Sequence, residues 1–486
     1  MSPTIVILTI VAYAATLFVV AWLSGRRVSG DKFFTGGRNT PRVVAAIAMV
    51  GAAMSGVTYI SVPGTVAMDH FSYLQTTLGF VLGYVVIAYL LIPLYYRLGV
   101  VSLYEYLDRR FSITEHRTGA WLFFVSKITS ASLRAYVVCV VVQSLLYEKL
   151  GIPFTVNAAV MMLFVWLYTR RGGVRSVVWV ETLKTTLMSL SVVMCIIFVM
   201  RALDFNIAET VSAISESQYS EVFFFDNPLD RRYFWKQLVS GIFLVIAMTG
   251  LDQDMMQTML TCRTQRDAQR GMITSIAIQS VVILLFLLLG ALLYIFVDRR
   301  GLSVAHGDDL FGFVATECGL PSTVGILFLL GLVASTYSSA GSALTALTTS
   351  FTLDILGAKR DDSKQRRVAH LGIALAMTAL IIAFNEWSTA GAITLIFTMA
   401  SYTYGPLLGL FAFGLFTRRM PRRWAVPTMS FVAPALSYAL ATHSEMLLAG
   451  YIFSYEIIVV NASIMFLGLL MMSKSREHSG SLNNPA

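Results

Sequence analysis

Residues 42–69, RVVAAIAMVGAAMSGVTYISVPGTVAMD, form an apolar run that is long enough to cross a bilayer but is interrupted near its middle. The interruption is GAAMSG at residues 51–56, and a second one, MTGLDQD at residues 248–254, lies within residues 233–260. A broken transmembrane helix exposes carbonyl groups that need partners, which a bound cation or solute commonly supplies. The two stretches predict a transporter with its site at the breaks, although membrane glycines also serve close helix packing.

The composition places most of the chain in a membrane. Hydrophobic residues make up 56% of the sequence, charged residues 13%, and the mean hydropathy is +0.71, far more apolar than a soluble core requires. The apolar runs are continuous rather than alternating, which indicates helices and not a barrel. The first run lacks a basic n-region and a small-residue cleavage pattern, so we expect a helix there rather than a signal peptide.

We therefore expect an all-α polytopic membrane protein with about thirteen transmembrane helices. They fall at residues 3–24, 42–69, 73–98, 119–148, 152–169, 174–201, 233–260, 266–297, 321–353, 368–385, 389–416, 424–442 and 449–473. The second to sixth and the seventh to eleventh helices form two blocks. Each block has five helices. Because five is an odd number, the second block enters the membrane from the opposite side and is inverted relative to the first, and each block opens with a broken helix.

The chain is predicted to be one transporter domain with six parts. These are residues 1–41 (an extra helix and loop), 42–201 (first repeat), 202–232 (external loop), 233–416 (second repeat), 417–473 (two C-terminal helices) and 474–486 (cytoplasmic tail).

The distribution of lysine and arginine predicts the orientation. With the N-terminus outside, the cytoplasmic segments carry 26 of these residues and the opposite side carries 7. The positive-inside rule then places the C-terminus in the cytoplasm, in a cell inner (plasma) membrane. The net charge of +9 follows from this topology and does not call for a nucleic acid. No protein partner is evident, and the four scattered cysteines show no disulfide or metal spacing.

A hydroxyl-lined face runs along residues 321–353. Ser335, Ser338, Ser339 and Ser342 are spaced i, i+3, i+4 and i+7, so they share one side of the helix. Hydroxyl groups and freed carbonyl groups together can surround a monovalent cation. The same serines also permit close helix packing, which is the simpler explanation of the pattern.

Few ionisable groups fall inside the predicted helices: Lys127, Arg134, Glu181, Lys184, Asp252 and Asp254. Arg134 lies halfway along its helix and needs an anionic partner from the protein or from a ligand. Glu181 and Lys184 can neutralise each other at i, i+3. The two aspartates point to opposite sides, so we expect one to face the pathway and the other to pair with a lysine such as Lys127.

No catalytic, metal or phosphate-binding pattern is visible, and the six histidines lie at helix ends or in loops. We therefore do not expect an enzyme.

Four signatures in a fixed order make the chain similar to the sodium:solute symporter family, from the first helix to about residue 470. They are RGGVRSVVWVE (171–181), GLDQDMMQ (250–257), STYSSAGS (335–342) followed by Asp354, and YGPLLGL (404–410). The resemblance implies the leucine-transporter-type fold, two inverted five-helix repeats plus flanking helices. It also implies alternating access driven by Na⁺, the one metal ion expected.

By position, the resemblance assigns the sodium site to carbonyl groups of Gly51, Met54 and Ser335 and to hydroxyl groups of Ser338 and Ser339. It assigns the substrate pocket to Ser55, Thr58, Gln75, Arg134, Asp252 and Gln253, and a second-ion or coupling role to Glu181 and Ser342. Two departures argue against a second sodium: Lys184 stands where glutamine is common, and Gly341 removes one serine oxygen. Asp252 replaces the asparagine of sugar carriers.

The leading hypothesis is symport of a small organic anion, such as sialic acid or another carboxylate. Sialic-acid carriers of this family resemble the chain in this respect, because they present an arginine from the corresponding helix to the carboxylate of the substrate. In a second interpretation Arg134 pairs with Asp252 or Asp254, and the solute is a neutral sugar, a polyol or an amino acid. A third is a transporter-like sensor, although the tail after Ser473 is short for a signalling domain.

Overall fold

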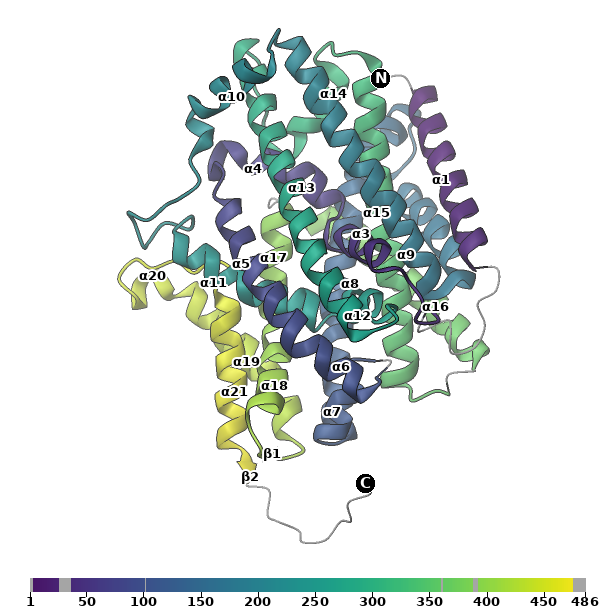
Figure 1. Cartoon of the computed structure of the whole chain (residues 1–486), viewed down its shortest axis with the longest axis vertical. Coiled ribbons are helices and arrows are strands. Elements are labelled where there is room, and N and C mark those ends of the chain that lie inside the picture. The colour runs from purple at the N-terminus through teal and green to yellow at the C-terminus, as the bar shows by residue number, and fades with distance from the viewer. Residues whose placement is uncertain (1–2, 26–35, 101, 360–361, 388–391, 475–486) are drawn as a thin grey trace.

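The computed structural model describes residues 3–25, 36–100, 102–359, 362–387 and 392–474, which form a bundle of helices (Figure 1). Within these residues, eight helices are long and apolar enough to span a membrane, and three bent pairs raise the number to as many as eleven. Two shorter apolar helices, Phe154–Arg170 and Ile457–Met471, stand outside that number. The all-helical membrane architecture is confirmed, whereas the count of thirteen stays a prediction.

The first block contains α3 to α9, preceded by α1. The bounds are α1 (Pro3–Gly25), α3 (Arg42–Ala53), α4 (Gly56–Asp69), α5 (Tyr73–Val86), a π-helical turn (Ile87–Leu91), α6 (Ile92–Leu98), α7 (Glu105–Arg110), α8 (Ile113–Val142), a π-helical turn (Gln143–Tyr147) and α9 (Phe154–Ala202).

The second block follows α10 (Ile207–Ser215). Its elements are α11 (Phe234–Val245), a π-helical turn (Ile246–Gly250), α12 (Gln253–Leu260), α13 (Gln265–Arg299), α14 (Leu310–Glu317), α15 (Ser322–Ser350), a π-helical turn (Phe351–Ile355), α16 (Ser363–Trp387), α17 (Ala392–Thr403) and α18 (Gly405–Phe416). The chain then forms α19 (Ala425–Thr442), α20 (Ser444–Leu447) and α21 (Ile457–Met471), and β1 (Met420–Pro421) pairs with β2 (Ser473–Lys474) in antiparallel fashion.

Both predicted breaks are present. α3 and α4 meet at 63° across Met54 and Ser55, and the α11 segment meets α12 at 67° across Leu251 and Asp252. Met54 N still donates to Val50 O, but Met54 and Ser55 both have extended backbone angles, so the i to i−4 ladder of hydrogen bonds stops after Met54. Each break therefore leaves carbonyl groups that need partners from elsewhere in the protein.

A third bend lies in the range 389–416, which the sequence analysis treated as one uninterrupted helix. α17 and α18 meet at 44° across Tyr404. Pro406 stands in the first turn of α18, where its missing N–H costs little, but without that N–H it cannot donate to Tyr402 O and carry the ladder of α17 into α18, and Tyr402 O accepts from Asn461 Nδ2 instead. The pair Gly405-Pro406 was the signal for this bend.

α9 contains both helices predicted at residues 152–169 and 174–201. Two hydrogen bonds show that its two parts bend back on each other: Tyr168 donates to Tyr337 O, and Lys184 donates to Ser339 Oγ. A straight helix would separate residues 168 and 184 by about 24 Å, too far for side chains that reach neighbouring positions of α15. Both parts of α9 thus pack on the same helix.

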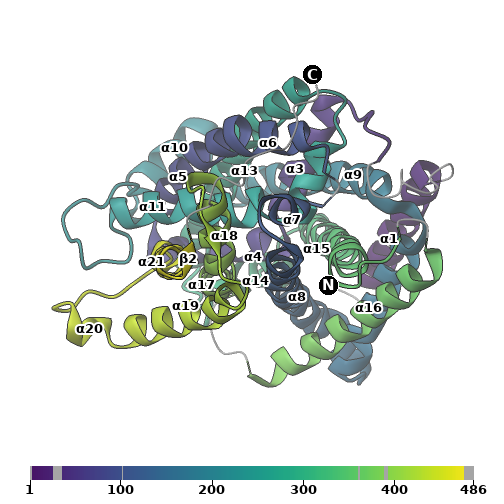
Figure 2. The ribbon, with the colours of Figure 1, turned by 90° about the horizontal axis from the view of Figure 1, so that it is seen from below.

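The two ends of the molecule are formed by different connections. α10 and α14 lie at one end, whereas α7 and the β1–β2 pair lie at the other (Figure 1). The predicted external loop 202–232 begins at the first end with α10, which Asn206 and Glu209 cap reciprocally, and then runs along the side of the bundle to α11 (Figure 1). α15 runs through the interior, whereas α1 and α16 lie at the periphery (Figure 2). The predicted tail 474–486 lies outside the described residues except for Lys474.

Candidate functional site

The first break packs against α9 with no spare room. A Cβ atom on Gly51 would lie 2.7 Å from Glu181 Oε2 and 2.5 Å from Thr185 Oγ1. A Cβ atom on Gly56 would likewise lie 2.3 Å from Thr336 Oγ1 on α15. Only glycine allows so close an approach, so these two glycines set the distance between the opened turn and its two neighbouring helices.

The freed carbonyl group of Gly51 accepts a hydrogen bond from a lysine. Lys184 Nζ lies 2.5 Å from Gly51 O, 2.6 Å from Ser339 Oγ and 3.1 Å from Glu181 Oε2. The side chains of Lys184 and Glu181 are fully buried, and the predicted pairing between them is present. The opened turn of α3 and the serine face of α15 therefore meet, with an ammonium group between them.

The predicted sodium donors are only partly free to bind an ion. Gly51 O and Ser339 Oγ both contact Lys184, and Ser335 O accepts from Ser339 Oγ at 2.8 Å. Ser338 Oγ is buried without a hydrogen bond in the described chain, as is Glu181 Oε1. The donors are neutral oxygens of the kind that suits sodium, but two of the five already hold a cationic group, so in this arrangement the set does not fit a sodium ion.

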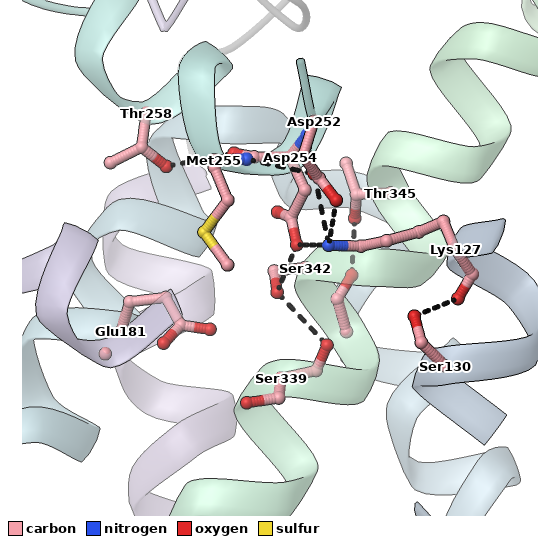
Figure 3. Close-up of polar contacts among 12 residues, drawn as sticks. Lys127, Ser130, Glu181, Asp252, Asp254, Met255, Thr258, Ser339, Ser342 and Thr345 are labelled. Atoms are coloured by element: carbon pink, nitrogen blue, oxygen red, sulfur yellow. Dashed lines mark hydrogen bonds and ion pairs between the residues drawn. The ribbon is translucent and has the colours of Figure 1, made fainter. Parts of the chain in front are cut away.

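A second cluster joins the start of α12 to α8 (Figure 3). Lys127 Nζ lies 2.8 Å from Asp254 Oδ2 and 3.1 Å from Asp252 Oδ2. The expectation that only one aspartate pairs with lysine is wrong, because the ammonium group lies between both carboxylates. Tyr404 donates to Asp252 Oδ2 at 2.7 Å, and Ser342 Oγ lies 3.2 Å from Asp254 Oδ2 and 3.1 Å from Ser339 O. Ser342 thus links this cluster to the first break.

Tyrosine hydroxyl groups satisfy the carbonyl groups freed at the second break. Tyr95 donates to Gly250 O at 3.0 Å, and Tyr104 donates to Leu251 O at 2.9 Å. Asp252 caps α12 by accepting from the N–H groups of Asp254 and Met255. Gly250 O and Leu251 O, two of the carbonyl groups freed at this break, are therefore satisfied by protein groups.

Arg134 is the enclosed cation without a partner. Within the described residues it forms no ion pair and no hydrogen bond, and its Nε is buried and unsatisfied. The interpretation in which Arg134 pairs with Asp252 or Asp254 is not what the structure has, because Lys127 occupies both carboxylates. The guanidinium group is left available to a ligand.

Arg134 lines two cavities that meet at the first break. The small cavity has about 20 Å³ of space for the centre of a water molecule, and its walls include Ser55, Lys127, Arg134, Asp254, Ser339 and Ser342. About 10–15 Å³ of such space holds one water, so the small cavity suits a single water molecule. The large cavity has about 70 Å³ and includes Ser55, Thr58, Tyr73, Phe80, Tyr84 and Arg134 in its walls. The large cavity is the one with room for part of a solute.

Three predicted substrate residues line neither cavity. Gln75 Nε2 donates to Arg232 O at 2.8 Å and its Oε1 accepts from Phe224 N, so the amide fastens the loop before α11. Gln253 Oε1 accepts from Leu103 N. Asp252 is used by its ion pair and its helix cap. These polar groups already have partners within the protein, so the structure does not support their assignment to the pocket wall.

The aromatic wall of the large cavity was missed by the sequence analysis. Tyr73, Phe80 and Tyr84 project from α5, and Phe397 comes from α17 and stacks on Tyr73 at 6.5 Å between ring centroids. The spacing of the α5 residues, i, i+7 and i+11, puts them on one face and was the available signal. No spacing within one helix could have revealed Phe397.

Comparison with known proteins gives a consistent result. The model of the sodium:solute symporter family matches residues 33–431. A sodium/sialic acid symporter of Proteus mirabilis is 22% identical over 429 residues, which cover 84% of this chain and 83% of that protein. The human sodium/iodide cotransporter is 23% identical over 403 residues, 81% of this chain and 62% of its own length.

A solved structure, that of a substrate-bound Na⁺-coupled sialic acid symporter in its outward-open state, has the same fold. Its TM-score against this chain is 0.82 at 19% identity, and the likeness covers 97% of this chain and 99% of the other. The predicted leucine-transporter-type fold is thereby confirmed.

Proposed function

Because the chain belongs to the sodium:solute symporter family, we propose that it imports a small organic anion, such as sialic acid or another carboxylate, together with sodium by alternating access. It is a multi-pass membrane transporter and not an enzyme. Its coupling ion is sodium, the ion for which the family is named.

The unpaired guanidinium group of Arg134 carries the anion proposal. It lies in the wall shared by both cavities, and no carboxylate of the described chain neutralises it. A buried guanidinium favours a carboxylate, because two parallel N–H···O bonds form between planar groups. The two relatives named above transport sialic acid and iodide, both of which are anions, and their names support the same class of solute.

The balance of enclosed charge supports coupling to a cation. Three basic and three acidic groups surround the two breaks, Lys127, Arg134, Lys184, Glu181, Asp252 and Asp254, and their formal charges cancel. An anion that entered alone would leave this poorly solvated region with one negative charge in excess. An anion accompanied by one sodium ion keeps the region neutral, which lowers the cost of loading.

The walls of the large cavity limit which solutes can bind. Aromatic rings of Tyr73, Phe80 and Tyr84 face the same space as Arg134 and the hydroxyl groups of Ser55 and Thr58. We infer that the carboxylate lies at Arg134, that the hydroxyl groups of the first break orient it, and that the body of the solute packs on the rings.

We place the N-terminus outside the cell and the C-terminus in the cytoplasm of a plasma membrane. The excess of lysine and arginine on one set of loops, 26 against 7, supports this orientation. We also propose that transport requires neither a nucleic acid nor an obligate protein partner.

Purified protein in liposomes tests the proposal. Uptake of labelled sialic acid, of simple monocarboxylates and of neutral sugars is measured with and without an inward sodium gradient. Removing a charged hydrogen-bonding pair costs about 1.5–3 kcal/mol, so Arg134→Ala should weaken apparent anion affinity about 10- to 150-fold. Arg201→Ala, at the exposed end of α9, is the matched control and should leave affinity unchanged. Uptake of neutral sugars only, indifferent to Arg134→Ala, would refute the proposal.

A further inference from the structure

Lys184 is held at the first break by a complete set of acceptors. An ammonium group has three donors, and Lys184 has three acceptors within reach: Gly51 O, Ser339 Oγ and Glu181 Oε2. Neither Lys184 nor Glu181 is exposed to solvent. The group is thus fully satisfied without water, in contrast to Arg134.

The contacts with the break are closer than the contact with the neighbouring acid. Nζ lies 2.5 Å from Gly51 O and 2.6 Å from Ser339 Oγ, but 3.1 Å from Glu181 Oε2. A lysine that only neutralised a glutamate at i, i+3 would need neither α3 nor α15. The ammonium group instead joins the opened turn of one helix to the serine face of another, which is the position predicted for a sodium ion.

The backbone around Lys184 is fixed by its neighbour. Thr185 Oγ1 donates toward Ile47 O at 3.0 Å and Glu181 O at 2.8 Å, so α9 is fastened to α3 one residue away. Gly51 allows this approach because any Cβ there would collide with Glu181. The ammonium group is therefore aimed at the break by the packing of two helices.

We propose that the ammonium group of Lys184 is a tethered cation that takes the place of sodium at the first break. The predicted donor set of Gly51, Met54, Ser335, Ser338 and Ser339 then holds no sodium in the wild-type protein, since a second cation at the same oxygens would be repelled at contact distance. This inference rests on the proposed function and deepens it, because the coupling sodium must bind outside this set of donors. Removing the charge of Lys184 should open the set to sodium.

Sodium binding to purified protein tests the inference without measuring transport. Thermal unfolding is followed in NaCl and in choline chloride of equal ionic strength, and binding of ²²Na⁺ is counted. Lys184→Ala should gain a sodium-dependent rise in Tm of about 1–2 °C at roughly ten times the Kd, together with one additional bound sodium. Adding Ser339→Ala to this variant should abolish both gains.

Lys236→Ala is the matched control. Lys236 is also a buried lysine whose ammonium group donates to carbonyl groups, Leu229 O at 3.2 Å and Ile452 O at 3.1 Å, but neither of these partners belongs to a break. This variant should gain no sodium response. If Lys184→Ala does not fold, Lys184→Gln serves, because it removes the charge and keeps hydrogen-bonding capacity.

Two results would overturn the inference. One is a wild-type protein whose sodium-dependent stabilisation is lost in Ser339→Ala, because the set would then bind sodium beside Lys184. The other is an unchanged sodium response in both neutral variants of Lys184. Failure of anion uptake with an intact sodium result would count against the proposed function alone, so the two can fail separately.

Discussion

Replacing Gly51 by alanine adds one methyl group where the first break packs closely against α9. Its Cβ would lie 2.5 Å from Thr185 Oγ1, 2.7 Å from Glu181 O and 2.7 Å from Glu181 Oε2. Ordinary contacts begin near 3.4 Å, so α3 and α9 must separate by several tenths of an ångström. Overpacking of this kind costs about 1–3 kcal/mol. One of the three contacts is with a backbone oxygen, so Thr185→Ala should not rescue the variant.

Thermal unfolding of purified protein in detergent measures this cost. At about 1 °C per kcal/mol for a chain of 486 residues, Gly51→Ala should lower Tm by about 1–3 °C. Gly372→Ala is the matched control, because a Cβ at Gly372 in α16 would meet no atom within 4 Å. That change should raise stability by about 0.5–1 kcal/mol, since alanine is the better helix former. A Gly51→Ala protein that melts with the wild type would refute the geometry given for the break.

Three further predictions concern the clusters and the cavity. Lys127→Met leaves two buried carboxylates without their ammonium partner and should lower the free energy of unfolding by about 3–5 kcal/mol, measured as a fall in Tm. The double variant Lys127→Met/Asp254→Asn should recover part of this loss. An equal loss in both variants would count against the ion pairs. Gln75→Leu should lower Tm through about 1 kcal/mol for each lost hydrogen bond and leave the KM of anion uptake unchanged, so a raised KM would return Gln75 to the pocket. Phe80→Ala should raise that KM by removing a ring from the large cavity, and an unchanged KM would place the solute elsewhere.

The breaks could be predicted because their causes are local. Glycines and small polar residues inside an otherwise continuous apolar run cannot sustain a helix as leucine or alanine would, and both predicted positions bend. The serine face of α15 was equally visible, since Ser335, Ser338, Ser339 and Ser342 recur at helical spacing. The bend at Tyr404 has a local cause as well, in Gly405-Pro406, but was not deduced from it.

The partners of the exposed groups could not be predicted because they come from distant parts of the chain. Lys184 and Gly51 are 133 residues apart, and nothing in either segment specifies that α9 packs on α3 at that height. Gln75 shows the converse case, since a glutamine early in α5 suggested a pocket until the loop near Arg232 was seen to use both ends of its amide. Burial identifies a polar side chain that needs a partner, but only the packing of helices decides which partner it finds.

The satisfied carbonyl groups at the two breaks have a consequence for the speed of the transport cycle. Three hydrogen bonds hold the bends to neighbouring segments. Lys184 donates to Gly51 O, Tyr95 to Gly250 O and Tyr104 to Leu251 O. A hinge that flexes at these points must break these hydrogen bonds before it can move. The rate of solute exchange should therefore rise steeply with temperature, and trimming one tyrosine hydroxyl should flatten that dependence.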